Sequence, residues 1–176
     1  MKKFEGVLLA TDWDATIFCN GTVSEENIKA IEYFQENGGI FTVCSGRYYD
    51  FLLSHRDKIR PNTYSVCLNG AYIADTENGD ILYRGKCDDR IFSIIDELFL
   101  NGDEYINIYL YADNGDIHTY THDEYKNNLE DIKKKCYYKI LLYAKDEEAG
   151  DRAKRRADKF EAPGYTVVRS FRKGIE

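Results

Sequence analysis

The sequence contains no apolar run long enough to cross a membrane. Its apolar stretches are short and interrupted by charge, whereas a spanning helix needs about 20 consecutive apolar residues. The N-terminus, MKKFEGVLL, carries two lysines, but its apolar run is cut off by Asp12 and Asp14 and does not have the pattern of a signal peptide. The sequence therefore predicts a cytoplasmic protein that makes no contact with a membrane.

The chain also lacks an excess of basic residues. Its 176 residues include 24 Lys and Arg against 31 Asp and Glu, which gives a net charge of −7. This charge argues against nucleic acid or an anionic membrane as the main partner. A small phosphorylated molecule is still compatible, because a metal ion can neutralise a local group of carboxylates.

The cysteines lack the spacing of a metal site or a disulfide framework. The five of them are scattered, odd in number and form no CxxC pair: Cys19, Cys44, Cys67, Cys87 and Cys136. This pattern predicts reduced and mostly buried thiols.

The first half of the chain alternates strands and helices. Strands are expected over residues 4–12 and 40–46, and residues 63–75 are expected to form a third strand, or a strand and the start of a hairpin. Helices are expected over residues 24–39, where Ser24 has the features of an N-cap, and over 47–59. This order predicts right-handed crossovers and a parallel sheet. Ligands bind at the carboxyl ends of such strands, so the segments after the three strands should meet in one crevice.

The second half changes character. Asn-Gly pairs at 78–79 and 114–115 predict β-hairpins. Helices are expected over residues 88–102, 123–135 and 146–160, and strands over 106–112, 116–122, 137–145 and 165–171. This mixture predicts an α+β domain. We place the first domain at residues 1–80 and the second at 81–176, with the boundary between Gly79 and Gly85.

The stretch VLLATDWDATIF, residues 7–18, ends an apolar strand in two carboxylates. In an extended chain residues i and i+2 point the same way, so Asp12 and Asp14 can face one site while Trp13 points away. Buried carboxylates are costly unless metal, protons or donors compensate them. With Mg²⁺ present, one carboxylate can attack phosphorus while the other transfers a proton. Ser45 and the amide of Gly46 would donate to phosphate oxygens.

Three segments carry a family resemblance. DWDATIF resembles the DxDGT motif of the haloacid dehalogenase superfamily, VCSGR resembles its second motif, and SVCLNGA is similar to a turn of the Cof-type sugar-phosphatase branch. The resemblance implies an α/β fold, with a partial Rossmann-like parallel-sheet core followed by an α+β cap domain. It also implies a Mg²⁺-dependent phosphomonoesterase that acts on a small phosphorylated metabolite, with sugar phosphates as the favoured class, through an aspartyl-phosphate intermediate.

The resemblance assigns roles to single residues. Asp12 would be the nucleophile and a Mg²⁺ ligand, and Asp14 would be the general acid and base and would lend its backbone carbonyl to the metal. Ser45 would hold the transferring phosphoryl group. The other residues implied near the phosphate are Thr16, Gly46, Arg47 and Asn69.

Two features depart from the family pattern. Ala15 replaces the usual Gly, and if this position needs φ > 0, its Cβ costs on the order of 1 kcal/mol. The lysine motif and the second acidic motif are not found before the chain ends at RSFRKGIE. Without the strands that accompany them, residues 7–12 would form an unpaired sheet edge. Either the chain is a fragment of a longer protein, or another chain covers that edge, as in a homo-oligomer.

Two other functions stay open at this stage. The chain could be a non-catalytic relative that binds phosphate or metal without turnover, which the missing acidic motif favours. It could also be a receiver-like phosphoacceptor domain, but the hairpin-rich second half argues against that interpretation.

Overall fold

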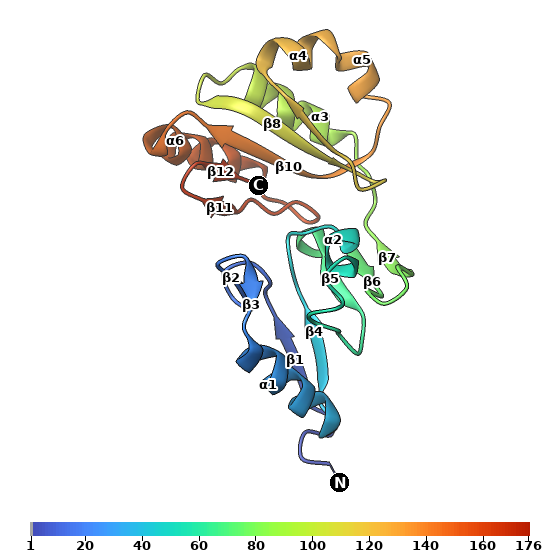
Figure 1. The fold of residues 1–176 in the computed structure, drawn as a ribbon. Helices are drawn as coiled ribbons and strands as arrows, with labels where there is room; N and C mark the ends of the chain where they lie inside the picture. Colours follow the sequence, from blue (N-terminus) through green and yellow to red (C-terminus); the bar gives the residue numbers. More distant parts are fainter. Residues whose placement is uncertain (1) are drawn as a thin grey trace. The chain divides into compact units, whose positions relative to one another are not determined.

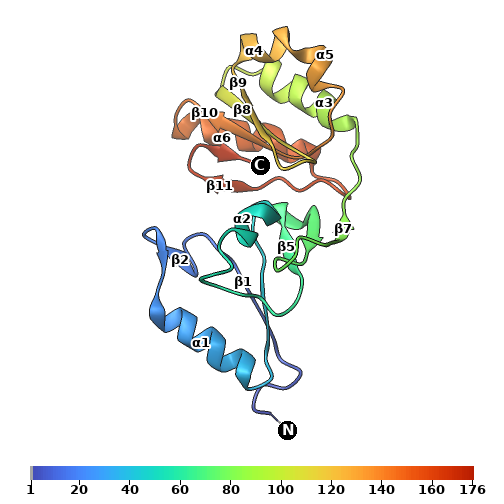
Figure 2. The same ribbon diagram turned by 45° about the vertical axis from the view of Figure 1, so that its right-hand side comes forward.

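The chain folds into two compact units, Met1–Gly85 and Lys86–Glu176. The structure is a computed structural model that describes residues 2–176. Figure 1 and Figure 2 show the two units from two directions, with the first in blue to green and the second in green to red. No helix among these residues is long and apolar enough to span a bilayer.

Parallel strands form the centre of the first unit. β1 (Leu8–Thr11) pairs in parallel with β4 (Ile40–Val43), with Leu8 opposite Ile40. A further parallel bridge joins Cys44 to Val66 of β5 (Ser65–Cys67). Three strand ends therefore point the same way, as predicted.

α1 (Glu25–Glu36) connects β1 to β4. It begins after Ser24, whose side chain accepts a hydrogen bond from the backbone N–H of Asn27 at 3.2 Å. This contact satisfies one of the free N–H groups at the helix start. The predicted N-cap is confirmed.

Hairpins complete the first unit. β2 (Phe18–Cys19) pairs with β3 (Thr22–Val23), and β5 continues through the short helix η1 (Leu68–Gly70) into an antiparallel sheet with β6 (Tyr72–Ala74) and β7 (Ile81–Arg84). The turn between β6 and β7 contains Gly79 at φ +82°, as its Asn-Gly signal predicts. Because β7 pairs with β6, residues 81–84 lie in the first unit.

The helix predicted over residues 47–59 is much shorter in the structure. α2 spans only Tyr49–Leu53. The hydroxyl of Ser54 donates to the carbonyl oxygen of Phe51 at 2.7 Å, and a ring nitrogen of His55 contacts the same oxygen at 2.8 Å. Side chains that bond to nearby backbone in this way compete with helix continuation, which explains the early end.

The second unit is built on one antiparallel sheet in the order β11-β12-β10-β8-β9. Its strands are β8 (Tyr105–Ala112), β9 (Ile117–Tyr120), β10 (Tyr137–Ala144), β11 (Arg169–Phe171) and β12 (Gly174–Ile175). Its helices are α3 (Arg90–Ile95), η2 (Asp96–Leu100), α4 (His122–Asn127), α5 (Leu129–Ile132), α6 (Glu147–Ala157) and η3 (Asp158–Phe160).

One core joins these helices to the sheet. The buried strand residues alternate along β8 at Ile108, Leu110 and Ala112, which is the period expected of one covered face. Side chains of α3, η2, α4, α5 and α6 pack on that face in the same cluster. The predicted α/β fold class, with an α+β second part, is confirmed. The strand predicted over residues 165–171 was too long, since only its last three residues are in β11.

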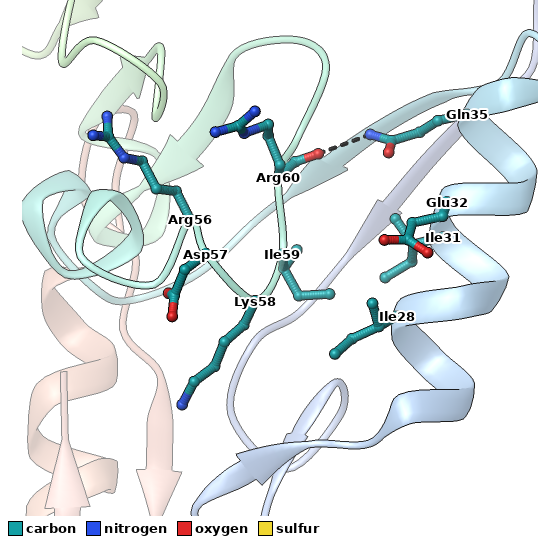
Figure 3. Close-up of a pocket in the computed structure, with 9 residues that line it drawn as sticks. All are labelled: Ile28, Ile31, Glu32, Gln35, Arg56, Asp57, Lys58, Ile59 and Arg60. Atoms are coloured by element: carbon teal, nitrogen blue, oxygen red, sulfur yellow. Dashed lines mark hydrogen bonds between the residues drawn. The ribbon is translucent and has the colours of Figure 1, made fainter.

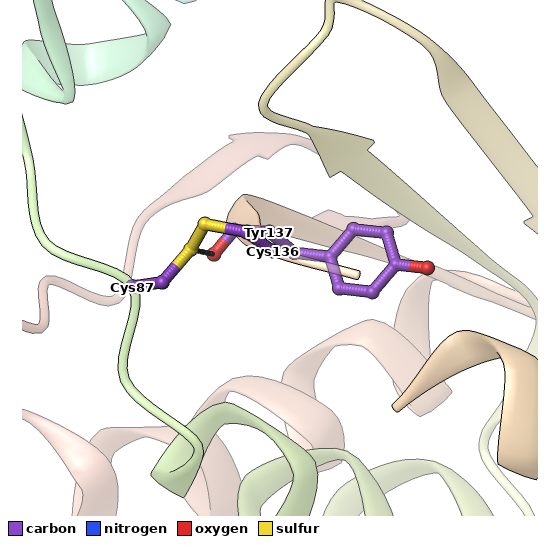
Figure 4. The surroundings of a disulfide bond; sticks show 3 residues. All are labelled: Cys87, Cys136 and Tyr137. Atoms are coloured by element: carbon purple, nitrogen blue, oxygen red, sulfur yellow. Dashed lines mark hydrogen bonds between the residues drawn. A yellow bond between two sulfur atoms is a disulfide. The ribbon is translucent and has the colours of Figure 1, made fainter. Parts of the chain in front are cut away.

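A disulfide corrects the prediction of five reduced thiols. Cys87, in the connector before α3, is bonded to Cys136, directly before β10, and their Cα atoms lie 5.7 Å apart (Figure 4). This separation is within the range that a disulfide requires. The other three cysteines are free. The pairing was missed because the two residues are 49 positions apart and are brought together only by the tertiary fold.

Replacing Cys87 with serine is expected to lower the free energy of unfolding by about 2–4 kcal/mol, because the cross-link restricts the unfolded chain. Urea titration without reductant measures the change, and Cys19→Ser, at an exposed free cysteine, should leave the midpoint unchanged. Reductant should shift the wild type to the Cys87→Ser midpoint. Equal midpoints for oxidised and reduced wild type would contradict the prediction.

Candidate functional site

Backbone hydrogen bonds bring the ends of β1, β4 and β5 together. The N–H of Cys44 donates to the carbonyl oxygen of Thr11 at 2.8 Å, and the N–H of Ser45 donates to that of Val66 at 2.9 Å. The N–H of Asn69 in turn donates to the carbonyl oxygen of Ser45 at 3.2 Å. The segments that carry the predicted site residues are therefore adjacent, although they lie far apart in the sequence.

The loop after β1 exposes the two carboxylates and buries the residue between them. Asp12 and Asp14 are exposed, whereas Trp13 is 1% exposed. The loop closes on itself, because the N–H of Phe18 donates to the carbonyl oxygen of Trp13 at 2.9 Å and the N–H of Ala15 donates to that of Phe18 at 3.0 Å. The loop therefore carries both carboxylates on its outer side and turns the indole inward.

Aromatic packing fixes this loop to the unit. The ring of Trp13 stacks on Phe18 at 5.5 Å between centroids and meets Phe51 and His55 edge-on at 5.9 and 5.5 Å. Phe51 and His55 belong to α2 and to the turn after it. The short helix therefore serves as a platform that holds Trp13, and with it the backbone of Asp12 and Asp14.

Arg47 binds Asp14 through two hydrogen bonds. Its Nε donates to Oδ2 at 2.9 Å and its Nη2 donates to Oδ1 at 2.7 Å. The guanidinium also lies over the ring of Phe51, 4.6 Å from its centroid. Two-point contacts of this kind fix orientation as well as charge. The sequence placed Arg47 near a phosphate but gave no sign of its pairing with Asp14.

Ser45 is the buried polar residue of the site. Its side chain is almost fully enclosed, and its Oγ accepts the backbone N–H of Arg47 at 3.1 Å. Hydrogen bonds thus link Asp14, Arg47, Ser45 and Asn69 into one chain of contacts. Asp12 and Thr16 lie on the same loop as Asp14, and Gly46 lies between Ser45 and Arg47.

A tyrosine cluster next to the site was not found from the sequence. Tyr48 lies 4.5 Å from Tyr49 and 5.3 Å from Tyr72 between ring centroids. Burial raises the pKa of Tyr48 well above its usual value, and the hydrogen bond with Tyr49 adds to the increase. The Tyr48 phenol therefore stays protonated at neutral pH. The only sequence signal was the pair of tyrosines directly after Arg47.

Cys67, at the end of β5, is not a candidate nucleophile. Burial raises the pKa of its thiol to about 12, and the nearby Cys44 adds to the shift. Since the thiolate is the reactive form, this thiol is a poor nucleophile at neutral pH.

Ala15 adopts the left-handed conformation, with φ at +57°. A Cβ is unfavourable there, since L-residues with a side chain pay on the order of 1 kcal/mol in this region. The replacement Ala15→Gly is therefore expected to raise the free energy of unfolding by up to about 1 kcal/mol, measured by urea titration.

A matched control tests the cause. Ala30 lies exposed in α1, and Ala30→Gly should lower stability by about 0.5–1 kcal/mol. A loss of stability in both variants would show that Ala15 is not strained.

The donor set at the strand end suits a hard cation. Asp12 and Asp14 offer oxygen atoms only, and Mg²⁺ is commonly bound through one or two carboxylates while it keeps several waters. Residues 2–176 contain no group of three or more His, Cys, Asp or Glu side chains arranged for a metal ion. The chemistry of the two aspartates fits Mg²⁺, with the rest of its coordination coming from water and substrate.

A cavity of about 350 Å³ lies elsewhere in the first unit. It is bordered by α1 and by residues 56–60, with Ile28, Ile31 and Ile59 forming its apolar part, and Gln35 donates to the carbonyl oxygen of Arg60 at 2.8 Å on one side (Figure 3). None of the predicted site residues lines it. The cavity is therefore separate from the carboxylate site.

Residues 9–176 match a family model described as haloacid dehalogenase-like hydrolase, and this range contains the whole candidate site. The chain belongs to the haloacid dehalogenase-like hydrolase family. The family membership predicted from the sequence is therefore confirmed.

A curated relative supports the assignment. A protein of Buchnera aphidicola, whose name assigns it provisionally to the phosphatases, is 25% identical over 112 residues. The match covers 57% of this chain and 40% of the relative, so the chain spans well under two thirds of that protein.

Solved structures of the haloacid dehalogenase type share the fold. A HAD/COF-like hydrolase from Plasmodium vivax matches with a TM-score of 0.72 at 16% identity, covering 99% of this chain and 68% of its own. A haloacid dehalogenase-like hydrolase from B. subtilis gives 0.69 at 19% identity, with 96% and 71% covered. A subclass IIB sugar phosphatase gives 0.68 at 14% identity, with 96% and 68% covered. At these identities the likeness establishes the fold.

Proposed function

We propose that this chain is a Mg²⁺-dependent phosphomonoesterase acting on a small phosphorylated metabolite, with sugar phosphates as the favoured class. The observation that carries the proposal is the hydrogen-bonded chain from Asp14 through Arg47 and Ser45 to Asn69. It brings the carboxylate of Asp14, two residues from Asp12, to groups that can donate hydrogen bonds to a phosphate at the same edge of the sheet. Membership of a hydrolase family supports this reading of the site.

Asp12 is the nucleophile in this proposal. Its carboxylate oxygen forms a bond to phosphorus while the bond from phosphorus to the ester oxygen breaks, and the leaving oxygen takes a proton from Asp14. Asp14 then removes a proton from water, whose oxygen attacks the aspartyl-phosphate. This second step releases inorganic phosphate and restores the carboxylate of Asp12.

The phosphoryl group is held by donors from the second and third strand ends. The Ser45 hydroxyl and the N–H of Gly46 bind its oxygens, with Thr16 and Asn69 nearby. Arg47 already holds one anion, the carboxylate of Asp14. A phosphoryl group that binds Arg47 would weaken that pair and would favour the protonated Asp14 that the first step needs.

Mg²⁺ would be held by the carboxylate of Asp12 and the backbone carbonyl of Asp14. When bound, it offsets the repulsion between the anionic nucleophile and the phosphate ester. In this proposal the second unit, Lys86–Glu176, is the cap domain that selects the substrate.

A non-catalytic phosphate-binding function is the second candidate. It is favoured by the two-point pairing of Asp14 with Arg47 and by the small number of carboxylates at the site. Such a protein would bind phosphate or Mg²⁺ without turnover.

Phosphate release from a panel of sugar phosphates separates the two functions. We expect release that depends on Mg²⁺ and stops with EDTA. A melting temperature raised by phosphate and Mg²⁺, with no release from any substrate, would instead support the binding function. Release that is insensitive to EDTA would overturn the metal-dependent mechanism.

A further inference from the structure

The disulfide between Cys87 and Cys136 lies where solvent can reach it. Cys87 is exposed and Cys136 is half-buried, and the bond joins the connector before α3 to the residue directly before β10 (Figure 4). Exposed disulfides are typically the labile or regulatory ones, because exchange requires a thiolate to approach one of the two sulfur atoms. A small thiol can therefore attack this bond in the folded chain.

The disulfide anchors the connector, residues 85–89, which joins β7 to α3. At one end the N–H of Gly85 donates to the carbonyl oxygen of Ala71 at 2.8 Å, which holds Gly85 to the first unit. Two positions later Cys87 is bonded covalently to the second unit. Lys86 is therefore the one residue between the two anchored positions.

The connector has surface contacts alone to replace this anchor. Asp88 is exposed and shares a side-chain hydrogen bond with Tyr165, and its carboxylate accepts the backbone N–H of Arg90 at 2.9 Å. Exposed contacts of this kind contribute little to stability. After the connector, the chain first enters the core of the second unit at Ile91 and Phe92. Opening the disulfide would thus free residues 86–89.

We propose that the Cys87–Cys136 disulfide is a reversible redox clamp on the connector. When the bond is closed, the connector is held at Cys87. When the bond is open, residues 86–89 can leave the surface of the second unit. The clamp would operate whether or not the chain hydrolyses phosphate esters.

The clamp opens by exchange with two molecules of a small thiol such as glutathione. The first thiolate attacks Sγ of Cys87, the more exposed residue. A mixed disulfide forms there, the bond to Cys136 breaks, and Cys136 leaves as a thiolate that takes a proton. A second thiolate attacks the sulfur of the bound small thiol, which leaves as a small-molecule disulfide, and Cys87 becomes a thiol. Two electrons pass to the protein, and the small-molecule disulfide closes the clamp by the reverse steps.

Limited trypsin digestion tests the release of the connector, in a Cys19→Ser background that removes the exposed free thiol. We expect cleavage after Lys86 to become about tenfold faster on reduction, because proteases cut segments that can leave the fold. In Cys87→Ser, cleavage after Lys86 should be fast with and without reductant.

Cleavage after Lys126 is the control. Lys126 is exposed in α4, so cutting there reports unfolding of the second unit itself and should respond little to reductant. Equal acceleration at Lys86 and Lys126 would show a general loss of stability and would overturn the proposal. A cleavage rate after Lys86 that does not change on reduction would also overturn it.

Thiol alkylation tests whether the clamp is reversible and where exchange begins. After equilibration with reduced and oxidised glutathione, acid quenching and unfolding, mass spectrometry should find Cys87 and Cys136 free together in reducing buffers and bonded in oxidising ones. The result should be the same from either direction. In the folded state, Cys87 of Cys136→Ser should be alkylated several-fold faster than Cys136 of Cys87→Ser, because it is more exposed. A bond that persists in a large excess of reduced glutathione, or faster alkylation of Cys136, would contradict the proposal.

Discussion

Asp12→Asn is expected to lower Mg²⁺-dependent phosphate release by at least on the order of 10⁴-fold, the usual scale for removing a nucleophile. Asparagine has nearly the same shape as aspartate but lacks the negative charge that attacks phosphorus. Asp12 is exposed, so the thermal stability of the variant should match that of the wild type. Steady-state phosphate release and a melting curve measure both effects.

Asp57→Asn is the matched control for this variant. Asp57 is also exposed but lines the separate cavity beside α1, so its replacement should leave the rate unchanged. A rate for Asp12→Asn close to the wild-type rate would rule out Asp12 as the nucleophile.

Trp13→Ala is expected to lower the free energy of unfolding by about 3–5 kcal/mol, the range for truncating a large buried aromatic residue. The indole is almost fully enclosed and contacts the rings of Phe18, Phe51 and His55. Its loss would leave a cavity under the loop that carries Asp12 and Asp14. Urea unfolding followed by circular dichroism measures the change.

Trp13→Phe separates the packing of the aromatic ring from the cost of burying its N–H group. The Nε1 atom of Trp13 is buried with no hydrogen-bond partner among the described residues, and removing an unsatisfied polar group offsets part of the lost packing. The free energy of unfolding should therefore fall clearly less in Trp13→Phe than in Trp13→Ala. A loss below about 1 kcal/mol for Trp13→Ala would show that the loop is held by other contacts.

The alternation of short strands and helices in the sequence was enough to predict the parallel strands at the centre of the first unit. Ser24 and the spacing of apolar residues after it predicted α1. Polar residues at the ends of the strands predicted that these ends meet at one edge of the sheet. These signals are local, and the parallel topology follows from them through the crossover rule. The Asn-Gly turns are equally local, and the hairpins formed at both.

The features that sequence reasoning missed depend on three-dimensional contacts. Nothing near Arg47 in the sequence shows that its guanidinium reaches Asp14, 33 positions away. The partnership of Cys87 with Cys136 depends on the packing of the second unit. The early end of α2 depends on side-chain competition at Ser54 and His55, which helical periodicity does not reveal. The family resemblance supplied the roles of the aspartates, which spacing alone would not have assigned.

The position of Trp13 gives the molecule an optical probe of its own site. It is the only tryptophan in the chain, so the indole emission of the whole protein arises from the residue between Asp12 and Asp14. Its enclosed ring should emit at short wavelength, and quenching by iodide should be weak. A shift of the loop that carries the two carboxylates moves the backbone of this fluorophore, so loop movements during titrations with Mg²⁺ or phosphate can be followed without a label.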